Sequence, residues 1–184
     1  MYTVDMRIVG EDGKLLPHDG KAFGELQVKG HAIIDGYHED EEASVAAMTE
    51  DGWLKTGDVA RITPEGFMML VDRTKDLIKS GGEWISSIDL ENAAQGHPSI
   101  MECAVISAYH PQWGERPLLI AVTENDVTLN LEDIHEYLND KVAKWWLPDD
   151  VVFVEELPHT ATGKISKMTL REQFKDYKFE HSES

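Results

Sequence analysis

The sequence predicts an α+β fold in two parts: a β-rich barrel or sheet over residues 1–72, then a small mixed α+β domain over residues 73–184. Two observations support this prediction. In the first part, Val4–Val9 and Gly24–Lys29 alternate apolar and polar residues, as half-buried strands do. In the second part, short apolar runs alternate with helical patterns, as in domains whose helices pack on a sheet. The charged stretch at residues 72–75 separates the two patterns.

One helix and one hairpin complete the expected first part. Residues 39–48 are its only helix candidate, because this run contains three alanines, which are strong helix formers. Residues 53–62 and 67–71 are expected to be strands joined by the turn at residues 63–66. Pro at the second position and Gly at the fourth position of that turn suit a type I turn.

Turns and helix caps divide the second part into its elements. A small hairpin is expected around Gly81-Gly82. A helix is expected to begin after Ser86, with Asp89 three residues later as in a capping box, and to end near Gly96. Asn130 is the expected N-cap of a second helix. That helix carries an apolar stripe of Leu131, Ile134, Leu138 and Val142.

Three short apolar runs are expected to form buried strands, and they cover residues 101–108, 118–123 and 151–154. A polar loop, residues 159–163, then leads to a last helix over residues 166–177. Cys103 lies in the first of the apolar runs and is expected to be a small buried hydrophobe. Because it is the only cysteine, an intrachain disulfide is impossible, and a reducing cytoplasm is the expected compartment.

The composition is that of an acidic folded protein. Apolar residues make up 41% of the chain, and 17 basic against 35 acidic residues give a formal net charge of −18. Such a surface repels nucleic acid, so no nucleic-acid partner is expected. It also repels free ATP and CoA, so a site for either needs locally placed Lys or Arg. No stretch approaches the roughly 20 apolar residues of a transmembrane helix, and no signal peptide is expected.

Three residues stand in patterns suited to binding phosphates or sugars. Lys164 follows a Thr-Gly step, where a mobile ammonium can neutralise phosphate and carboxylate oxygens. Asp58 also follows a Thr-Gly step and can accept two hydroxyl hydrogen bonds, as from a ribose. Arg73 can fork onto ribose or phosphate oxygens. Taken singly, each also fits a structural role: a solvated loop lysine, a turn-capping aspartate, and an arginine in a surface ion pair with Asp72 or Asp76.

Two further features have both a binding and a structural interpretation. The run Ser80-Gly81-Gly82 permits close backbone approach to a ligand, and it equally suits an ordinary hairpin turn. Trp84 either stacks on a base or fills the core.

Three other kinds of site are rejected from the sequence. Lys164 does not belong to a nucleotide-binding phosphate loop, because Pro158 replaces the required upstream glycine and Ile165 follows the lysine. The histidines show no metal-ligand spacing, so no metal site is expected. Cys103 and His110 lack an orienting Asn or Asp at a recognisable spacing, so nucleophilic catalysis is not expected.

Three motifs in order resemble those of the adenylate-forming, acyl-activating superfamily. Residues 53–58, Trp-Leu-Lys-Thr-Gly-Asp, resemble its W/Y-x-x-T-G-D motif. Residues 72–91 resemble its hinge motif, and residues 158–165 resemble its terminal P-x-T-x-x-G-K motif. The resemblance covers nearly the whole chain. It is to the C-terminal portion of acyl-CoA synthetases, and the run at residues 78–87 is most like medium- and long-chain fatty-acid–CoA ligases.

The resemblance implies a two-step reaction. A carboxylate attacks the α-phosphate of Mg-ATP, giving an acyl-adenylate and pyrophosphate, and the CoA thiol then attacks the adenylate to give acyl-CoA and AMP. By this resemblance Lys164 is the catalytic residue that bridges the carboxylate and α-phosphate oxygens. Asp58 holds the ribose hydroxyls, and Arg73 contacts ribose or phosphate.

The resemblance also implies a rotation of residues 73–184 between the two steps. Lys75 matches the hinge position. The rotation withdraws Lys164 and brings Ser80-Gly81-Gly82 to the CoA side, with Trp84 near the nucleotide.

Some of the family's machinery is missing from this sequence. The Ser/Thr/Gly-rich phosphate loop, the Tyr-Gly-x-Thr-Glu motif that helps to bind nucleotide and Mg²⁺, and the acyl pocket do not occur in it. The isolated chain is therefore expected to be inactive. Its expected partners are an N-terminal domain of the same polypeptide and a fatty acid or other carboxylic acid. Two alternatives remain: a non-catalytic binding or regulatory module, and an adenylation domain that loads a carrier protein.

Overall fold

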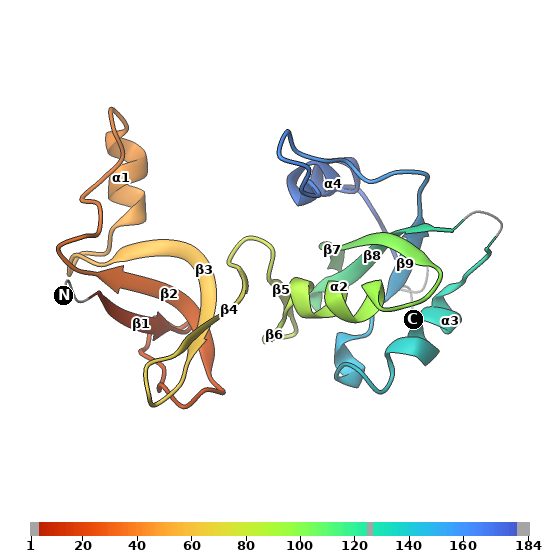
Figure 1. Cartoon of the computed structure of the whole chain (residues 1–184), viewed down its shortest axis with the longest axis horizontal. Helices are drawn as coiled ribbons and strands as arrows, with labels where there is room; N and C mark the ends of the chain where they lie inside the picture. The colour runs from red at the N-terminus through yellow and green to blue at the C-terminus, as the bar shows by residue number, and fades with distance from the viewer. Residues whose placement is uncertain (1–3, 125–126, 180–184) are drawn as a thin grey trace. The chain divides into compact units, whose positions relative to one another are not determined.

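The computed structural model describes residues 4–124 and 127–179, and it divides the chain into two units, Met1–Lys75 and Asp76–Ser184 (Figure 1). The division falls three residues after the boundary expected at residue 72. Asp72 and Arg73 belong to the first unit because they still pair in its sheet, with Val59 and Asp58.

From residue 4 onward, where the structure describes it, the first unit is a four-stranded antiparallel sheet in the order β1-β2-β3-β4, with one short helix. Alternate residues of the strands meet on one face, where Ile8, Leu26, Ala60 and Ile62 are buried together. This burial accounts for the period of two in the sequence. The elements are β1 (Asp5–Val9), β2 (Phe23–Lys29), α1 (Glu41–Ala47), β3 (Leu54–Ile62) and β4 (Met68–Arg73).

Local chemistry sets the ends of these elements. The carboxylate of Asp40 accepts a hydrogen bond from the Ala43 N–H, so α1 begins after Asp40, two residues later than the sequence indicated. The expected turn between β3 and β4 is confirmed, because the Gly66 N–H donates to the Thr63 carbonyl at 2.9 Å. Gly66 has a φ of +87°, a conformation that glycine adopts without a steric penalty.

In its described residues, 76–124 and 127–179, the second unit is a five-stranded sheet with three α-helices and one short 3₁₀-helix, η1. β8 is its central strand: it pairs antiparallel with β7 along its length, parallel with β9, and with β5 at Gly114. Together with the first unit, this arrangement confirms the predicted α+β fold. The elements are β5 (Ile78–Ser80), β6 (Glu83–Ile85), α2 (Ser87–Gln95), β7 (Ile100–His110), β8 (Gly114–Thr123), α3 (Leu131–Leu138), η1 (Lys144–Trp146), β9 (Asp150–Phe153) and α4 (Lys167–Gln173).

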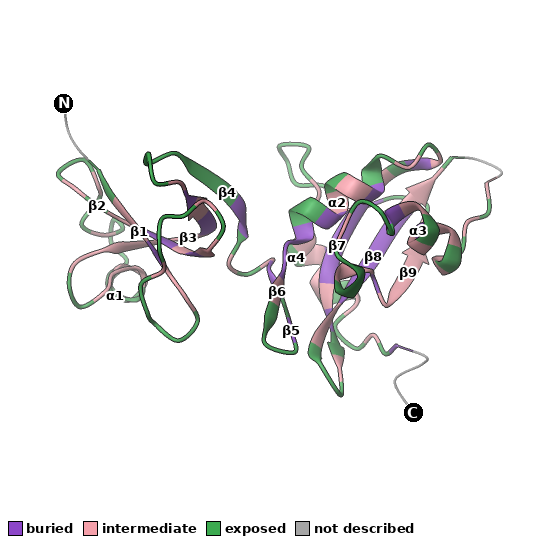
Figure 2. Ribbon diagram, turned by 90° about the horizontal axis from the view of Figure 1, so that it is seen from below, coloured by how far each residue is buried: buried purple, intermediate pink, exposed green. Residues whose placement is uncertain are grey.

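The strands β7 and β8 are buried on both faces (Figure 2). On one face, Cys103 and Val105 pack with Leu90 of α2 and Ile134 of α3. On the other face, the alternate residues of the same strands pack against Leu170 of α4. Two covered faces explain why these strands read as continuous apolar runs.

The burial of Cys103 as a small hydrophobe is confirmed. The side chain is buried, and burial raises the pKa of its thiol to about 12. The thiolate form that nucleophilic chemistry needs is therefore disfavoured.

Two predicted helices are shorter than expected. α3 ends at Leu138, so the prediction that Val142 continues its stripe was wrong. Asn139 and Asp140 follow Leu138, and their side chains compete with helical hydrogen bonding. Val142 nevertheless packs against the core through a turn after the helix.

α4 ends at Gln173, four residues earlier than the expected residue 177. Beyond it, Phe174 and Tyr177 pack on the sheet, and the Tyr177 hydroxyl donates to the Asp150 carboxylate at 2.5 Å. These contacts take the chain away from the helical path.

Candidate functional site

Asp58 and Arg73 face each other across β3 and β4 in the first unit. They are direct partners in the strand register, and Arg73 Nε lies 3.0 Å from Asp58 Oδ1. The two side chains are 57% and 28% exposed, Arg73 being the more exposed, so both reach solvent. The structure thus joins two of the predicted site residues. The ion pair of Arg73 is with Asp58 rather than with Asp72 or Asp76, and Asp76 instead binds Arg171.

A bulge in β3 sets the direction of Asp58. Gln27 pairs with Lys55 and Glu25 pairs with Val59, so residues 56–58 stand opposite a single residue of β2. Gly57 has a φ of +72° within this bulge, which disfavours a side chain there. The Thr56 hydroxyl donates to the Leu26 carbonyl at 2.9 Å and accepts from the Asp58 N–H at 3.1 Å. The Thr-Gly-Asp run therefore builds the backbone that presents the carboxylate.

Lys164 lies at the end of a closed loop in the second unit. The Gly163 N–H donates to the Thr160 carbonyl at 2.9 Å, and the Thr160 N–H donates to the Lys164 carbonyl at 2.7 Å. Gly163 has a φ of +77°, as in a hairpin loop whose turn ends on a left-handed residue. The Ser166 N–H donates to the Pro158 carbonyl at 2.7 Å and closes the base of the loop.

The Lys164 side chain is exposed, although the backbone beneath it is ordered by these hydrogen bonds. Its ammonium has no hydrogen-bond or ion-pair partner among residues 4–124 and 127–179. The structure therefore presents a cation whose charge is not neutralised within the part of the chain it describes. Such a group can approach an anionic ligand without first breaking an internal ion pair.

The run Ser80-Gly81-Gly82 forms a tight turn between β5 and β6. Ser80 pairs with Glu83, and the two glycines between them have φ values of +59° and +88°. Two central residues with positive φ are typical of a type I′ hairpin turn. Gly81 is further constrained, because its N–H donates to the Trp113 carbonyl at 2.8 Å and a Cβ would lie 2.8 Å from the Trp113 ring.

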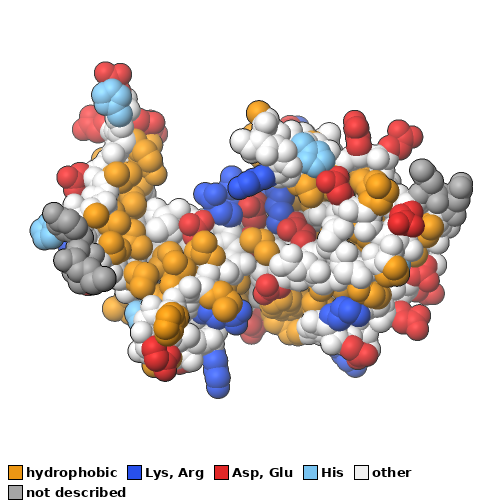
Figure 3. All heavy atoms as spheres, in the orientation of Figure 1, with side chains coloured by type: hydrophobic (Ala, Val, Ile, Leu, Met, Phe, Trp, Pro, Cys, Tyr) orange, Lys and Arg blue, Asp and Glu red, His pale blue; other side chains and the backbone are white. Residues whose placement is uncertain are grey.

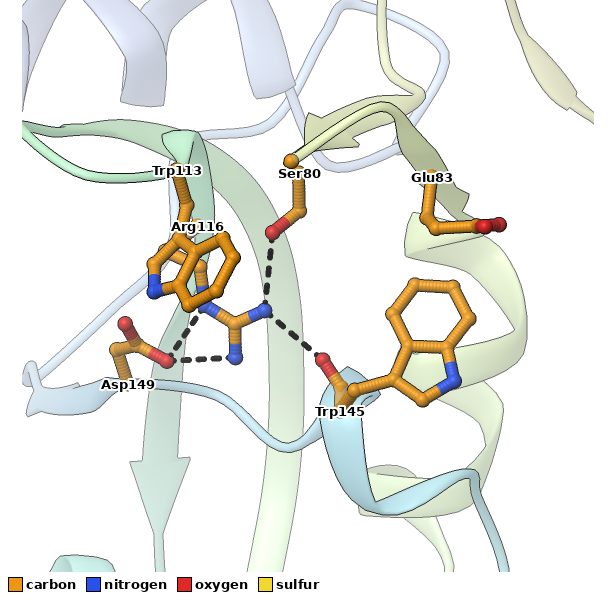
Figure 4. A pocket seen from close by; sticks show the side chains of 7 residues that line it. Ser80, Glu83, Trp113, Arg116, Trp145 and Asp149 are labelled. Atoms are coloured by element: carbon orange, nitrogen blue, oxygen red, sulfur yellow. Dashed lines mark hydrogen bonds and ion pairs between the residues drawn. The ribbon is translucent and has the colours of Figure 1, made fainter.

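This turn lies beside a pocket of about 570 Å³ (Figure 4). Two half-exposed indoles provide most of its flat apolar surface, Trp113 at 46% and Trp145 at 43% exposure. The pocket is lined by Ser80, Gly81, Glu83, Trp113, Arg116, Trp145 and Asp149.

Arg116 holds the pocket together (Figure 4). Its guanidinium binds the Asp149 carboxylate at 2.7 Å and donates to the Ser80 hydroxyl at 3.0 Å. It also donates to the backbone carbonyls of Trp145 and Leu147. Because Asp149 neutralises Arg116 and Glu83 adds a negative charge, the pocket favours a flat, uncharged group over a phosphate.

Sequence reasoning did not find Arg116, Trp113, Trp145 or Asp149. They come from the β7–β8 turn, from β8, and from the segment at η1, so no single motif contains them. The local signal was the presence of tryptophans outside the predicted strands and helices.

The two remaining predicted residues lie outside this pocket. Trp84 lies on β6, half-buried and opposite Lys79 in the strand register. Lys75 is exposed and is the last residue of the first unit. Their proposed roles with nucleotide and at a hinge remain predictions.

The described residues contain neither a metal-binding cluster nor a membrane-spanning helix. Within residues 4–124 and 127–179, no group of three or more His, Cys, Asp or Glu side chains is placed to hold a metal ion. Over the same residues, no helix has the length and apolar character needed to cross a membrane.

Comparison with known proteins finds a family similarity in the second unit. Residues 89–164 match the family described as the AMP-binding enzyme C-terminal domain. Two similar relatives are a 3-methylmercaptopropionyl-CoA ligase from Ruegeria pomeroyi, 49% identical over 175 residues, and a long-chain-fatty-acid–CoA ligase from Thermus thermophilus, 50% identical over 174 residues. Each similarity covers 95% of this chain and 32% of the relative, so the chain spans about a third of their length.

A solved structure shows the same fold. The ATP-bound MatB from Rhodopseudomonas palustris matches with a TM-score of 0.81 at 32% sequence identity. The match covers 95% of this chain and 35% of that one.

The contact between Gly81 and Trp113 predicts different costs for two neighbouring substitutions. Gly82→Ala places its Cβ in open space, so it should lower the unfolding free energy by about 1 kcal/mol, the cost of a side chain at positive φ. Gly81→Ala has a similar cost for positive φ, and its Cβ must also displace the Trp113 ring. The unfolding free energy should therefore fall by about 2–3 kcal/mol in total. Both losses can be measured by urea unfolding that is monitored through the NMR signals of the second unit. Equal losses would show that the ring contact does not constrain the turn.

Proposed function

We propose that this chain, which carries an AMP-binding enzyme C-terminal domain, is the C-terminal part of an ATP-dependent ligase that joins a carboxylic acid to CoA. The proposed reaction forms an acyl-adenylate and pyrophosphate, then forms acyl-CoA and releases AMP. ATP, with Mg²⁺, and CoA are the proposed cofactors. The ligands of Mg²⁺ are assigned to the preceding part of the polypeptide.

The observation that supports this proposal most strongly is the ordered loop that presents Lys164. A carboxylate and the α-phosphate are both anions, so their approach is unfavourable unless a cation lies between them. The chain carries a formal net charge of −18, so its overall field opposes such ligands. An exposed ammonium without an internal partner in the described structure supplies the local positive charge that the adenylation step requires.

Asp58 and Arg73 are assigned to the nucleotide. The Asp58 carboxylate accepts hydrogen bonds from the ribose hydroxyls, and Arg73 turns from Asp58 toward ribose or phosphate oxygens. The exposure of the pair and the 3.0 Å contact that already orders both side chains support this assignment. Trp84 is proposed to lie near the nucleotide.

Ser80, Gly81 and Gly82 are assigned to the CoA side of the reaction. The pocket beside Ser80 and Gly81 supports this placement, because its two indoles offer stacking surfaces for a flat ring such as the adenine of CoA. The turn reaches the reacting groups after the second unit rotates at Lys75. In this proposal the second unit contributes Lys164 to the first half-reaction and the Ser80-Gly81-Gly82 turn to the second.

The acid is proposed to be a medium- or long-chain fatty acid. The 50% identity to a long-chain-fatty-acid–CoA ligase supports this choice. The cytoplasm remains the proposed compartment, on the ground that the single cysteine is a free, buried thiol.

A preceding domain is proposed to supply the phosphate loop and the acyl pocket. Hydrophobic side chains gather on the visible face of the first unit (Figure 3). Phe67, Met68, Met69 and Leu70 are all exposed at the edge strand β4 and in the turn before it. An apolar edge strand of this kind is normally covered in the complete protein.

The isolated chain is expected to show no ATP–pyrophosphate exchange with a fatty acid, whereas a longer form that contains the preceding domain does. Radiolabelled pyrophosphate incorporated into ATP is the readout. Turnover by the 184 residues alone would contradict the assignment of the phosphate loop and acyl pocket to a separate domain. A longer form that binds ATP without exchange would favour a non-catalytic module.

Lys164→Ala in the longer enzyme is expected to reduce adenylation by about 100- to 1,000-fold, the usual effect of removing one group that stabilises developing charge. Thioester formation from preformed adenylate should stay within a few-fold, because Lys164 acts only in the first step. Lys175→Ala is the matched control, since Lys175 is an exposed lysine of the same unit that forms a surface ion pair with the nearby Glu172. Equal losses in both half-reactions would contradict the role of Lys164.

Transfer of the acyl group to a carrier protein in place of CoA would favour the carrier-loading alternative.

A further inference from the structure

Helix α4 follows the loop of residues 158–166, which carries Lys164 and is called the Lys164 loop below. Two ion pairs attach α4 to other parts of the second unit. Lys167 Nζ lies 2.7 Å from Glu91 Oε1 and donates to the Ser87 hydroxyl at 2.7 Å, so it connects α4 to α2. Arg171 forms an ion pair with Asp76. Lys167 and Arg171 are four residues apart and lie on the same face of the helix. α4 is therefore attached at two successive turns.

The first ion pair involves a residue that closely follows the Lys164 loop in the chain. Lys167 is three residues after Lys164, and Ser166 between them is both the N-cap of α4 and the residue whose N–H closes the loop onto Pro158. The loop and the first turn of the helix thus share one residue. A shift of Lys167 moves Ser166, and with it the base of the loop.

Glu91 gives this contact a fixed position. The same carboxylate oxygen accepts a hydrogen bond from the Val105 N–H of β7 at 2.7 Å. The Lys167 and Glu91 side chains are only 15% and 18% exposed, so water screens their attraction weakly. Lys167 is therefore attached, through Glu91, to the central sheet.

The second ion pair ends at the entry point of the unit. Asp76 is the first residue of the second unit, and it directly follows Lys75. Its side chain is 11% exposed. Arg171 therefore connects the helix of the Lys164 loop to the segment at which the chain enters the unit.

We propose that Lys167 and Arg171 are positioning residues for Lys164. They make the Lys164 loop, helix α4 and the segment after Lys75 one rigid body, so that a rotation at Lys75 delivers the ammonium to a defined place. The catalytic consequence rests on the proposed function, whereas the ordering of the loop does not. Neither residue contacts substrate in this proposal, and both act through the position of the loop.

The ordering of the loop is tested in this chain. Lys167→Met and Arg171→Met keep most of the aliphatic side chain and remove the charge, while Lys175→Met is the control at an exposed surface pair. Amide hydrogen exchange at Gly163 and Ser166 is the readout, because both N–H groups hold the loop closed. We expect exchange at these amides to accelerate at least about tenfold in Lys167→Met, with less change at core amides such as Ile120. Exchange that is unchanged, or that rises equally throughout the unit, would overturn the proposal.

The catalytic consequence is tested in the longer enzyme by measuring the two half-reactions separately. Lys167→Met is expected to lower adenylation by up to about 100-fold, the effect of misplacing a catalytic group by roughly an ångström. Thioester formation from preformed adenylate should change little, and Lys167→Arg, which keeps the charge, should restore adenylation in large part. Equal losses in both half-reactions, or no rescue by arginine, would indicate a structural role and overturn the proposal.

The second ion pair allows a charge exchange. Asp76→Arg and Arg171→Asp are each expected to lower adenylation, and the double variant should recover at least part of that loss. Losses that simply multiply would show that the pair does not act as a unit. A longer enzyme without ligase activity would instead refute the proposed function, and the amide-exchange result would still decide whether α4 orders the loop.

Discussion

The burial of β7 and β8 on both faces is the constraint on which the second unit depends. Alternate residues of these two strands belong to two hydrophobic cores. One core is covered by α2 and α3, and the other is covered by α4. The middle stretches of the two strands, residues 103–106 and 118–121, are therefore apolar at every position and carry no charged side chains for chemistry. The functional groups therefore lie at the ends of the strands and in the segments that cover them.

The candidate site follows from that arrangement. β8 begins at Gly114, where it pairs with Ser80 of the β5–β6 turn, and two residues later Arg116 gathers Ser80, Asp149 and the backbone at η1 into one pocket. Helix α4, which packs on one face of the same sheet, follows the Lys164 loop and is attached to α2 through Lys167 and Glu91. Two groups proposed for successive half-reactions are thus held by one sheet.

The fold could be predicted from sequence because its signals are local. Period-two strands, the Ser86 and Asn130 caps and the Gly81-Gly82 turn each depend on neighbouring residues, and the structure has them. Tertiary contacts decided the rest. α4 ends at Gln173 because the aromatic side chains that follow it pack on the sheet. The pocket around Arg116 joins segments up to 69 residues apart, from Ser80 to Asp149. The partner of Arg73 was missed for the same reason, because strand register, not sequence proximity, places Asp58 opposite it.

In the proposed function, the second unit changes position at Lys75 between the two half-reactions. The direct measurement is a distance between spin labels in the longer enzyme, attached at Val45→Cys in α1 and at Lys175→Cys beyond α4, both exposed positions. Cys103 should stay unlabelled, because it is buried and its thiol pKa is raised to about 12. We expect one distance with ATP and a non-reactive acid analogue and a different distance with AMP and CoA. A single distance under both conditions would contradict it.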